Sequence, residues 1–153
     1  MKVKPFSPEL YRDNDAEAKA KVLRYVNMKL AEYGLEELAL VQNPNRFGCD
    51  LILPQLRFFI EPGVKHNWEG AWFPFADVQV EQRKWKYAEP GPWGDWGCLW
   101  YLNDQFTHAI IFDHSELKGA GIRYVAAKYG EYAGSKEPFK FIGIEKCNII
   151  RLV

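Results

Sequence analysis

Apolar residues recur at helical spacing near the start of the chain and at strand spacing over most of the rest. Four of them form one stripe of a helix: Val22, Val26, Leu30 and Tyr33. Asn14 is suited to cap this helix, with Glu17 as its capping-box partner, and Gly34 is suited to end it. The pattern therefore predicts an irregular segment over residues 1–13 and a helix from Asp15 to Tyr33.

Short apolar runs separated by turn residues predict strands along the remainder of the chain. These strands are expected at 38–41, 47–53, 56–61, 98–102, 108–112, 140–142 and 148–152. Residues 77–87 are ambiguous, because Val78 and Val80 alternate like a strand whereas 83–87 suits a helix. A short second helix is expected over 115–118. This order of elements indicates an α+β fold, an α/β sandwich around a mixed sheet.

Composition and charge narrow the class of protein without naming a function. A chain of 153 residues suits a single domain over 1–153 with a core of its own. The formal net charge is zero, so any surface that binds nucleic acid must be a local one. The three cysteines form no CxxC pair, which argues against a zinc knuckle or a disulfide framework. No run resembles a signal peptide or a membrane span, so we expect a cytoplasmic protein without a membrane partner.

Two acids stand on the hairpin expected around Pro54-Gln55. With a connection of two or four residues there, strand pairing sets Asp50 opposite Phe59. The same pairing sets Gly48 opposite Glu61. Asp50 and Glu61 are then diagonal neighbours on one face, on the order of 7–8 Å apart at the backbone. Two carboxylates at that separation can share a divalent cation such as Mg²⁺; alternatively, both simply lie on the solvent face of an edge hairpin.

A basic and aromatic cluster follows later in the chain. It reads Arg83-Lys84-Trp85-Lys86-Tyr87, and three cations interleaved with two aromatic rings can contact phosphates and stack on bases. The alternative is a solvated helix face with one buried tryptophan. Two loops rich in tryptophan, 63–76 and 89–97, pack in the core or bind a sugar or a protein partner.

These features together resemble the PD-(D/E)xK nuclease superfamily, in particular small phage and bacterial members of unknown substrate. The helix 15–33, Phe47–Ile52 and Phe58–Glu61 carry the resemblance, and the ten residues between the two acids fit the hairpin of that family. Further matching positions are Glu61, Lys65, Trp68, Phe73-Pro74-Phe75, Arg83-Lys84, 107–112 and 139–142. The resemblance covers most of residues 15–152.

The resemblance implies a restriction-endonuclease-like core and metal-dependent hydrolysis of nucleic acid, above all DNA. It implies that Asp50 and Glu61 hold Mg²⁺ or Mn²⁺, that a backbone carbonyl next to Glu61 is a third ligand, and that Lys65 orients the attacking water. Glu17 is expected either to complete the metal site from the helix or to act in the capping box. Many small nucleases of this kind act as dimers, so the resemblance also allows a homodimer.

The chain departs from the family pattern at the lysine. The family places a lysine two residues after the second acid, where this chain has Gly63. Lys65 shares the parity of Glu61, and Arg83 or Lys84 is an alternative that reaches in from the next element. If no cation reaches the acids, the resemblance implies a catalytically degenerate relative that binds nucleic acid or a protein without cleavage. An unrelated domain that binds carbohydrate through its tryptophan loops is the third hypothesis.

Overall fold

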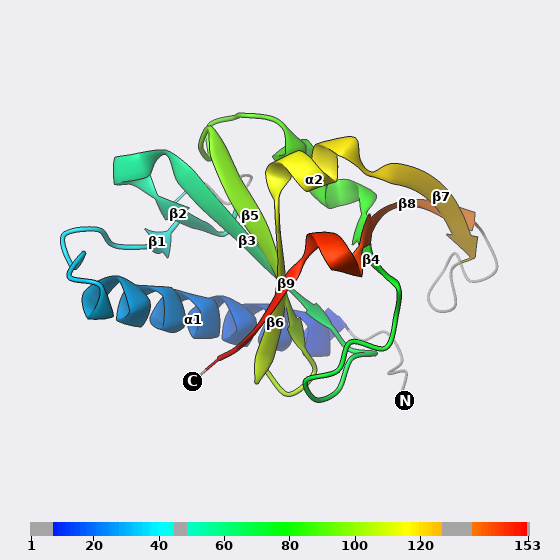
Figure 1. Ribbon diagram of the computed structural model, residues 1–153, viewed down its shortest axis with the longest axis horizontal. Coiled ribbons are helices and arrows are strands. Elements are labelled where there is room, and N and C mark those ends of the chain that lie inside the picture. Colours follow the sequence, from blue (N-terminus) through cyan, green and yellow to red (C-terminus); the bar gives the residue numbers. More distant parts are fainter. Residues whose placement is uncertain (1–7, 45–48, 127–135, 153) are drawn as a thin grey trace.

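A long helix, α1, lies across one face of a mixed sheet, and a smaller sheet with short helices lies on the other side (Figure 1). The computed structural model describes residues 8–44, 49–126 and 136–152, with side chains described from residue 16 onward. The helices are α1 Pro8–Glu32 and α2 His114–Gly119, with 3₁₀ segments η1 Pro54–Leu56, η2 Gln82–Ala88 and η3 Ile144–Lys146. The strands are β1 Val41–Gln42, β2 Leu51–Leu53, β3 Phe58–Lys65, β4 Asp77–Glu81, β5 Trp96–Asn103, β6 His108–Asp113, β7 Gly121–Ala126, β8 Lys136–Gly143 and β9 Asn148–Arg151.

Strand pairing places β3 at the centre of the larger sheet. Within the described ranges, six strands form this sheet in the order β1-β2-β3-β5-β6-β9, and three form a second sheet in the order β4-β8-β7. β3 and β5 are parallel, with Glu61 opposite Leu99 and Gly63 opposite Tyr101, and the other neighbours are antiparallel. The fold is therefore α+β with a mixed sheet, as the sequence predicts.

Both faces of β3 are covered. One apolar layer joins α1 to the sheet and includes Ala18, Val22, Leu51, Ile60 and Leu102. The other layer joins the sheet to α2, η2 and the second sheet, and includes Phe59, Tyr87, Tyr101, Phe112 and Leu117. Because side chains alternate along a strand, Glu61 shares the face of Phe59 and points into this second layer. Burial of each large apolar side chain contributes about 1.5–3 kcal/mol, so the strand that carries Glu61 is firmly held.

Helix α1 begins earlier than the sequence pattern predicts. It starts at Pro8, since proline is favoured at a first helical position, where its missing N–H costs no hydrogen bond. Asn14 therefore lies inside the helix, so the capping box with Glu17 and the irregular stretch over 8–13 were wrong; residues 1–7 lie outside the described part. The predicted end holds, because the helix stops at Glu32 and Gly34 adopts a left-handed φ of 74°.

The strand predictions hold better for β5, β6 and β9 than for the hairpin, whereas only 140–142 of β8 was predicted. The ambiguous segment 77–87 contains both expected elements, strand β4 and then helix η2. β3 continues to Lys65 through Pro62-Gly63, where a break was expected. Strand β7 was not predicted, and the expected strand start at 47–48 lies outside the described residues. No helix in the described ranges has both the length and the apolar character needed to cross a membrane.

Candidate functional site

The β2–β3 hairpin brings the two acids into contact. Its connection is η1 followed by Arg57, whose φ of 50° turns the chain into β3. Leu53 pairs with Phe58 and Leu51 with Ile60, so the predicted pairing of Asp50 with Phe59 was wrong by two residues. The connection still has an even length, which keeps the acids on one face. The Asp50 backbone N–H donates to Glu61 Oε1 at 3.1 Å, which makes the two acids direct neighbours.

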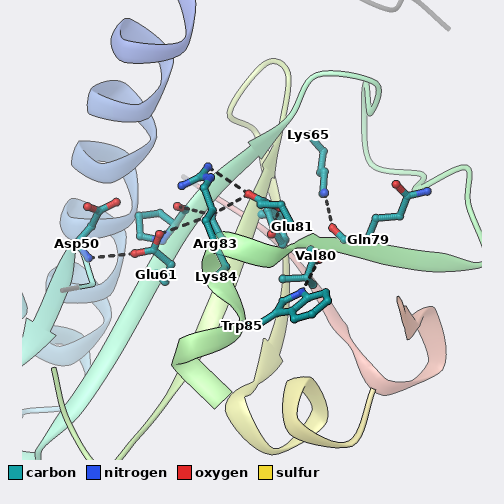
Figure 2. A network of polar contacts seen from close by, with 11 residues as sticks. Asp50, Glu61, Lys65, Gln79, Val80, Glu81, Arg83, Lys84 and Trp85 are labelled. Atoms are coloured by element: carbon teal, nitrogen blue, oxygen red, sulfur yellow. Dashed lines mark hydrogen bonds and ion pairs between the residues drawn. The ribbon is translucent and has the colours of Figure 1, made fainter. Parts of the chain in front are cut away.

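The amine of Lys84 fills the space above Gly63. A Cβ atom at position 63 would lie 2.6 Å from Lys84 Nζ and 2.8 Å from Tyr101 Cε1, so a side chain there would have to displace the amine and the ring. The ammonium group donates to the Pro62 carbonyl at 3.2 Å and lies 3.7 Å from Glu61 Oε2 (Figure 2). The position in which the family pattern has a lysine is thus taken by a lysine from another element.

The geometry of η2 aims Lys84 inward. A 3₁₀-helix has three residues per turn, so Glu81, Lys84 and Tyr87 fall on one side. The Lys84 side chain is only 2% exposed, whereas that of Arg83 is 63% exposed. Trp85 is half-buried against the core and donates from Nε1 to the Val80 carbonyl at 2.9 Å.

Glu81 is a second acid in contact with Lys84, and it was not predicted from the sequence. Its Oε1 lies 3.7 Å from Lys84 Nζ, and its Oε2 accepts a hydrogen bond from the Tyr101 hydroxyl at 2.9 Å. Burial acts to raise the pKa of Glu81, but the charges of Lys84 and Lys65 outweigh it and hold the pKa at about 2. The spacing Glu81-x-x-Lys84 at the entry to a helix was the available signal for this pair. Glu81 and Tyr101 together fix the amine beside Glu61.

Glu61 has the opposite electrostatic environment. Burial raises its pKa to about 7; Lys84 opposes this shift and the charge of Asp50 adds to it. The two oxygens of Glu61 face different partners, Oε1 the Asp50 side and Oε2 the Lys84 side. In Figure 2 Asp50, Glu61, Lys84 and Glu81 accordingly lie in a row. A carboxylate whose pKa lies near neutral pH, with a second acid beside it, is a typical feature of a functional site.

Lys65 lies farther along β3 and faces other groups. Four residues of strand separate it from Glu61, about 13 Å along the backbone. Its ammonium donates to the Gln79 carbonyl and stands 4.2 Å from the centre of the Tyr101 ring. Burial lowers the pKa of Lys65 to about 8. The structure therefore places Lys84, and not Lys65, in contact with the acidic pair.

The remaining predicted site residues are placed as follows. Glu17 is exposed on α1, and the neighbouring Lys19 lies 3.6 Å from Asp50 Oδ1. Within the described residues no three His, Cys, Asp or Glu side chains form a group able to hold a metal, so Glu17 is not brought to the acidic pair. Arg83 and Lys86 are exposed on η2, beside the site.

Acid titration provides a test of the Lys84–Glu81 contact. The folded-state pKa of Glu81 lies below its ordinary value of 4.5, so its stabilisation is present above pH 4.5 and is lost as the pH falls towards 2. We expect this group to contribute up to about 3 kcal/mol over that range. Urea unfolding of Glu81→Gln should show a correspondingly shallower acid decline than the wild type, while the exposed-acid control Glu36→Gln should follow the wild type. Parallel curves for all three proteins would contradict the contact.

Comparison with known proteins adds no family assignment. The sequence matches none of the protein-family models, and it matches none of the curated proteins. The resemblance to PD-(D/E)xK nucleases therefore stays a prediction.

Proposed function

We propose that this protein hydrolyses phosphodiester bonds of nucleic acid with the help of Mg²⁺ or Mn²⁺, and that DNA is its main substrate. The observation that carries the proposal is the position of Lys84 Nζ, which lies over Gly63 and 3.7 Å from Glu61. An acid pair with an amine in that place supplies carboxylates for a metal ion and a cation for the phosphate, both of which metal-dependent phosphodiester cleavage uses. We also propose that the protein acts in the cytoplasm.

The donor set suits a divalent cation. Asp50 and Glu61 are neighbouring acids, joined by the hydrogen bond from the Asp50 backbone N–H to Glu61 Oε1. Burial and the charge of Asp50 raise the pKa of Glu61, a cost that a bound cation relieves. They would hold the ion from the Asp50 side, because Lys84 covers the other oxygen of Glu61. When bound, such an ion lowers the pKa of a water molecule and neutralises charge on the phosphate.

The other residues of the site act on the phosphate directly and not as ligands of the metal. Lys84 places a fixed positive charge where negative charge builds up on the phosphate, and a preorganised charge in a water-poor site is effective there. Glu81 and Tyr101 hold the position of that amine. Arg83 and Lys86, exposed on η2, are suited to contact the phosphates on either side.

A cleavage assay on the full chain tests the proposal. Single-stranded, duplex, gapped and branched DNA and an RNA strand are incubated with Mg²⁺, with Mn²⁺ or with EDTA. We expect at least one form to be cut only with metal, and Asp50→Ala to lower the rate by about 10²-fold or more. Asp50 is part-exposed with Lys19 as its partner, a kind of pair worth only about 0–1 kcal/mol, so this variant should fold. The exposed-acid control Glu36→Ala should cut as the wild type does.

One observation favours the alternative, a catalytically degenerate protein that binds nucleic acid without cleaving it. Lys84 lies within 3.7 Å of both Glu61 and Glu81, and Lys19 lies 3.6 Å from Asp50, so the charges already compensate one another without a metal. A protein of this kind would bind nucleic acid and leave it intact. Retardation of DNA without cleavage in either metal would favour this alternative and overturn the hydrolytic proposal.

A further inference from the structure

A small open pocket lies beside the site, between the end of β3 and the start of β4. Its cavity volume is about 50 Å³, and it is lined by Lys65, Asn67, Phe73, Phe75, Asp77 and Gln79. That volume is well below the range of about 300–1,000 Å³ typical of enclosed small-molecule sites. The pocket is therefore an open hollow, which offers a face and an edge to one flat ring and does not enclose a larger ligand.

Its apolar wall is preorganised. Phe73 is 7% exposed and packs edge-on against the fully buried Trp68, with ring centres 5.4 Å apart. Phe75 in turn packs edge-on against Phe73 at 5.5 Å and is 39% exposed. One ring anchored in the core thus holds the other at the surface, where it can stack on a ligand.

The opposite side of the pocket is polar. Asn67 and Gln79 carry amides, which can both donate and accept, and Asp77 accepts at a carboxylate whose Oδ2 lies 3.2 Å from Arg123. Such groups beside an aromatic wall match the hydrogen-bonding edge and the flat face of a nucleobase. Recognition of this kind requires a base whose edge is not already paired.

Lys65 connects the pocket to the site. It lines the pocket, and both Lys65 and Lys84 lie over the Tyr101 ring, at 4.2 Å and 4.8 Å from its centre. The two ammonium groups are therefore no more than about 9 Å apart. Because Lys84 is only 2% exposed, a phosphate at the site would be contacted by the exposed Arg83, and a neighbouring nucleotide would bring its base to Lys65 and the pocket.

We propose that the pocket binds an unpaired nucleobase next to the phosphate that is cleaved at the site formed by Asp50, Glu61 and Lys84. This inference rests on the proposed function and makes it narrower, because the preferred substrate is then single-stranded or carries unpaired bases at the cut. A base inside a duplex must first be unstacked and unpaired, which costs energy.

Binding measured in EDTA separates this inference from catalysis. Fluorescence anisotropy at low salt compares a labelled oligothymidine with a duplex of the same length. We expect tighter binding of the single strand, and a loss of about 10-fold in its affinity in Phe75→Ala, since stacking contributes about 1–3 kcal/mol per base. Gln79→Ala removes a polar group without changing the aromatic wall and should also weaken the single strand. Tyr33→Ala is the matched control for an exposed aromatic ring, because Tyr33 is 76% exposed at the end of α1.

The outcomes are distinct. The inference is overturned if the single strand fails to bind, if the duplex binds as tightly, or if Phe75→Ala and Gln79→Ala bind like Tyr33→Ala. Metal-dependent cleavage together with unchanged single-strand binding in Phe75→Ala would support the proposed function and overturn the inference about the pocket. Selective loss of single-strand binding in a protein that cuts nothing would support the pocket and remove the hydrolytic function.

Discussion

Lys84→Met is expected to destabilise the protein by about 3–5 kcal/mol at pH 8, the usual cost of removing one partner of a buried ion pair. The side chain is 2% exposed and lies between Glu61 and Glu81, so its loss leaves two carboxylates without their shared cation. The cost should shrink at pH 5, because Glu61, whose pKa burial raises to about 7, takes up a proton there. Urea unfolding at both pH values measures the difference.

The same variant should lower metal-dependent cleavage by about 10²–10³-fold when assayed at a temperature where it is folded. Lys118→Met is the control, since it removes an exposed lysine of α2 that is paired with the exposed Glu89 and should change stability by no more than about 1 kcal/mol. Cleavage by folded Lys84→Met at the rate of Lys118→Met would show that the buried amine has no part in the chemistry.

Glu61→Gln is expected to stabilise the protein while it removes the activity. The folded-state pKa of Glu61, about 7, lies above its ordinary value of 4.5. Folding therefore favours the protonated form, and stability falls as the pH rises from 4.5 through 7. A neutral amide avoids this loss, so the variant should be up to about 3 kcal/mol more stable than the wild type at pH 8 and equal to it near pH 4.5.

Cleavage by Glu61→Gln should be at least about 10²-fold slower, because the amide is a poor ligand for a hard cation. Calorimetric titration with Mn²⁺ should show binding to the wild type and none to the variant. Gains in stability that accompany lost activity are typical of functional sites. A variant that is less stable at pH 8, or that binds Mn²⁺ as the wild type does, would contradict the electrostatics assigned to this carboxylate.

The acidic pair was predictable in part. Strand alternation and an even connection place Asp50 and Glu61 on one face whatever the register. The register itself depends on η1 and on the left-handed turn at Arg57, which composition does not reveal. As a result the two acids are direct neighbours, and the expected diagonal arrangement was wrong.

The cation was harder to predict because its contact is non-local. Lys65 points to the same face of the strand as Glu61, but the rise of the strand places it about 13 Å farther along the backbone. Lys84 reaches the acids only because η2 packs its inward face over Gly63 and Tyr101, although Lys84 lies 22 residues beyond Pro62 in the sequence. Sequence reasoning offered Arg83 or Lys84 without a choice, and the three-residue period of η2 decides between them.

Moving the lysine from position 84 to position 63 tests most directly whether the Lys84 amine serves in place of a lysine at position 63. Removing Lys84 opens the space that a side chain at Gly63 would enter, although the Tyr101 ring must also shift. The measurement is the initial rate of metal-dependent cleavage by Lys84→Ala, by Lys84→Ala with Gly63→Lys, and by Lys84→Ala with Gly119→Lys. Gly119 has no atom within 4 Å of an added Cβ, so the third protein controls for an added surface lysine. We predict that the lysine at position 63 restores at least about 10-fold of the lost rate and that the lysine at position 119 restores none. Folded double variants that are both as slow as Lys84→Ala, or a Lys84→Ala protein as fast as the wild type, would contradict the proposed site.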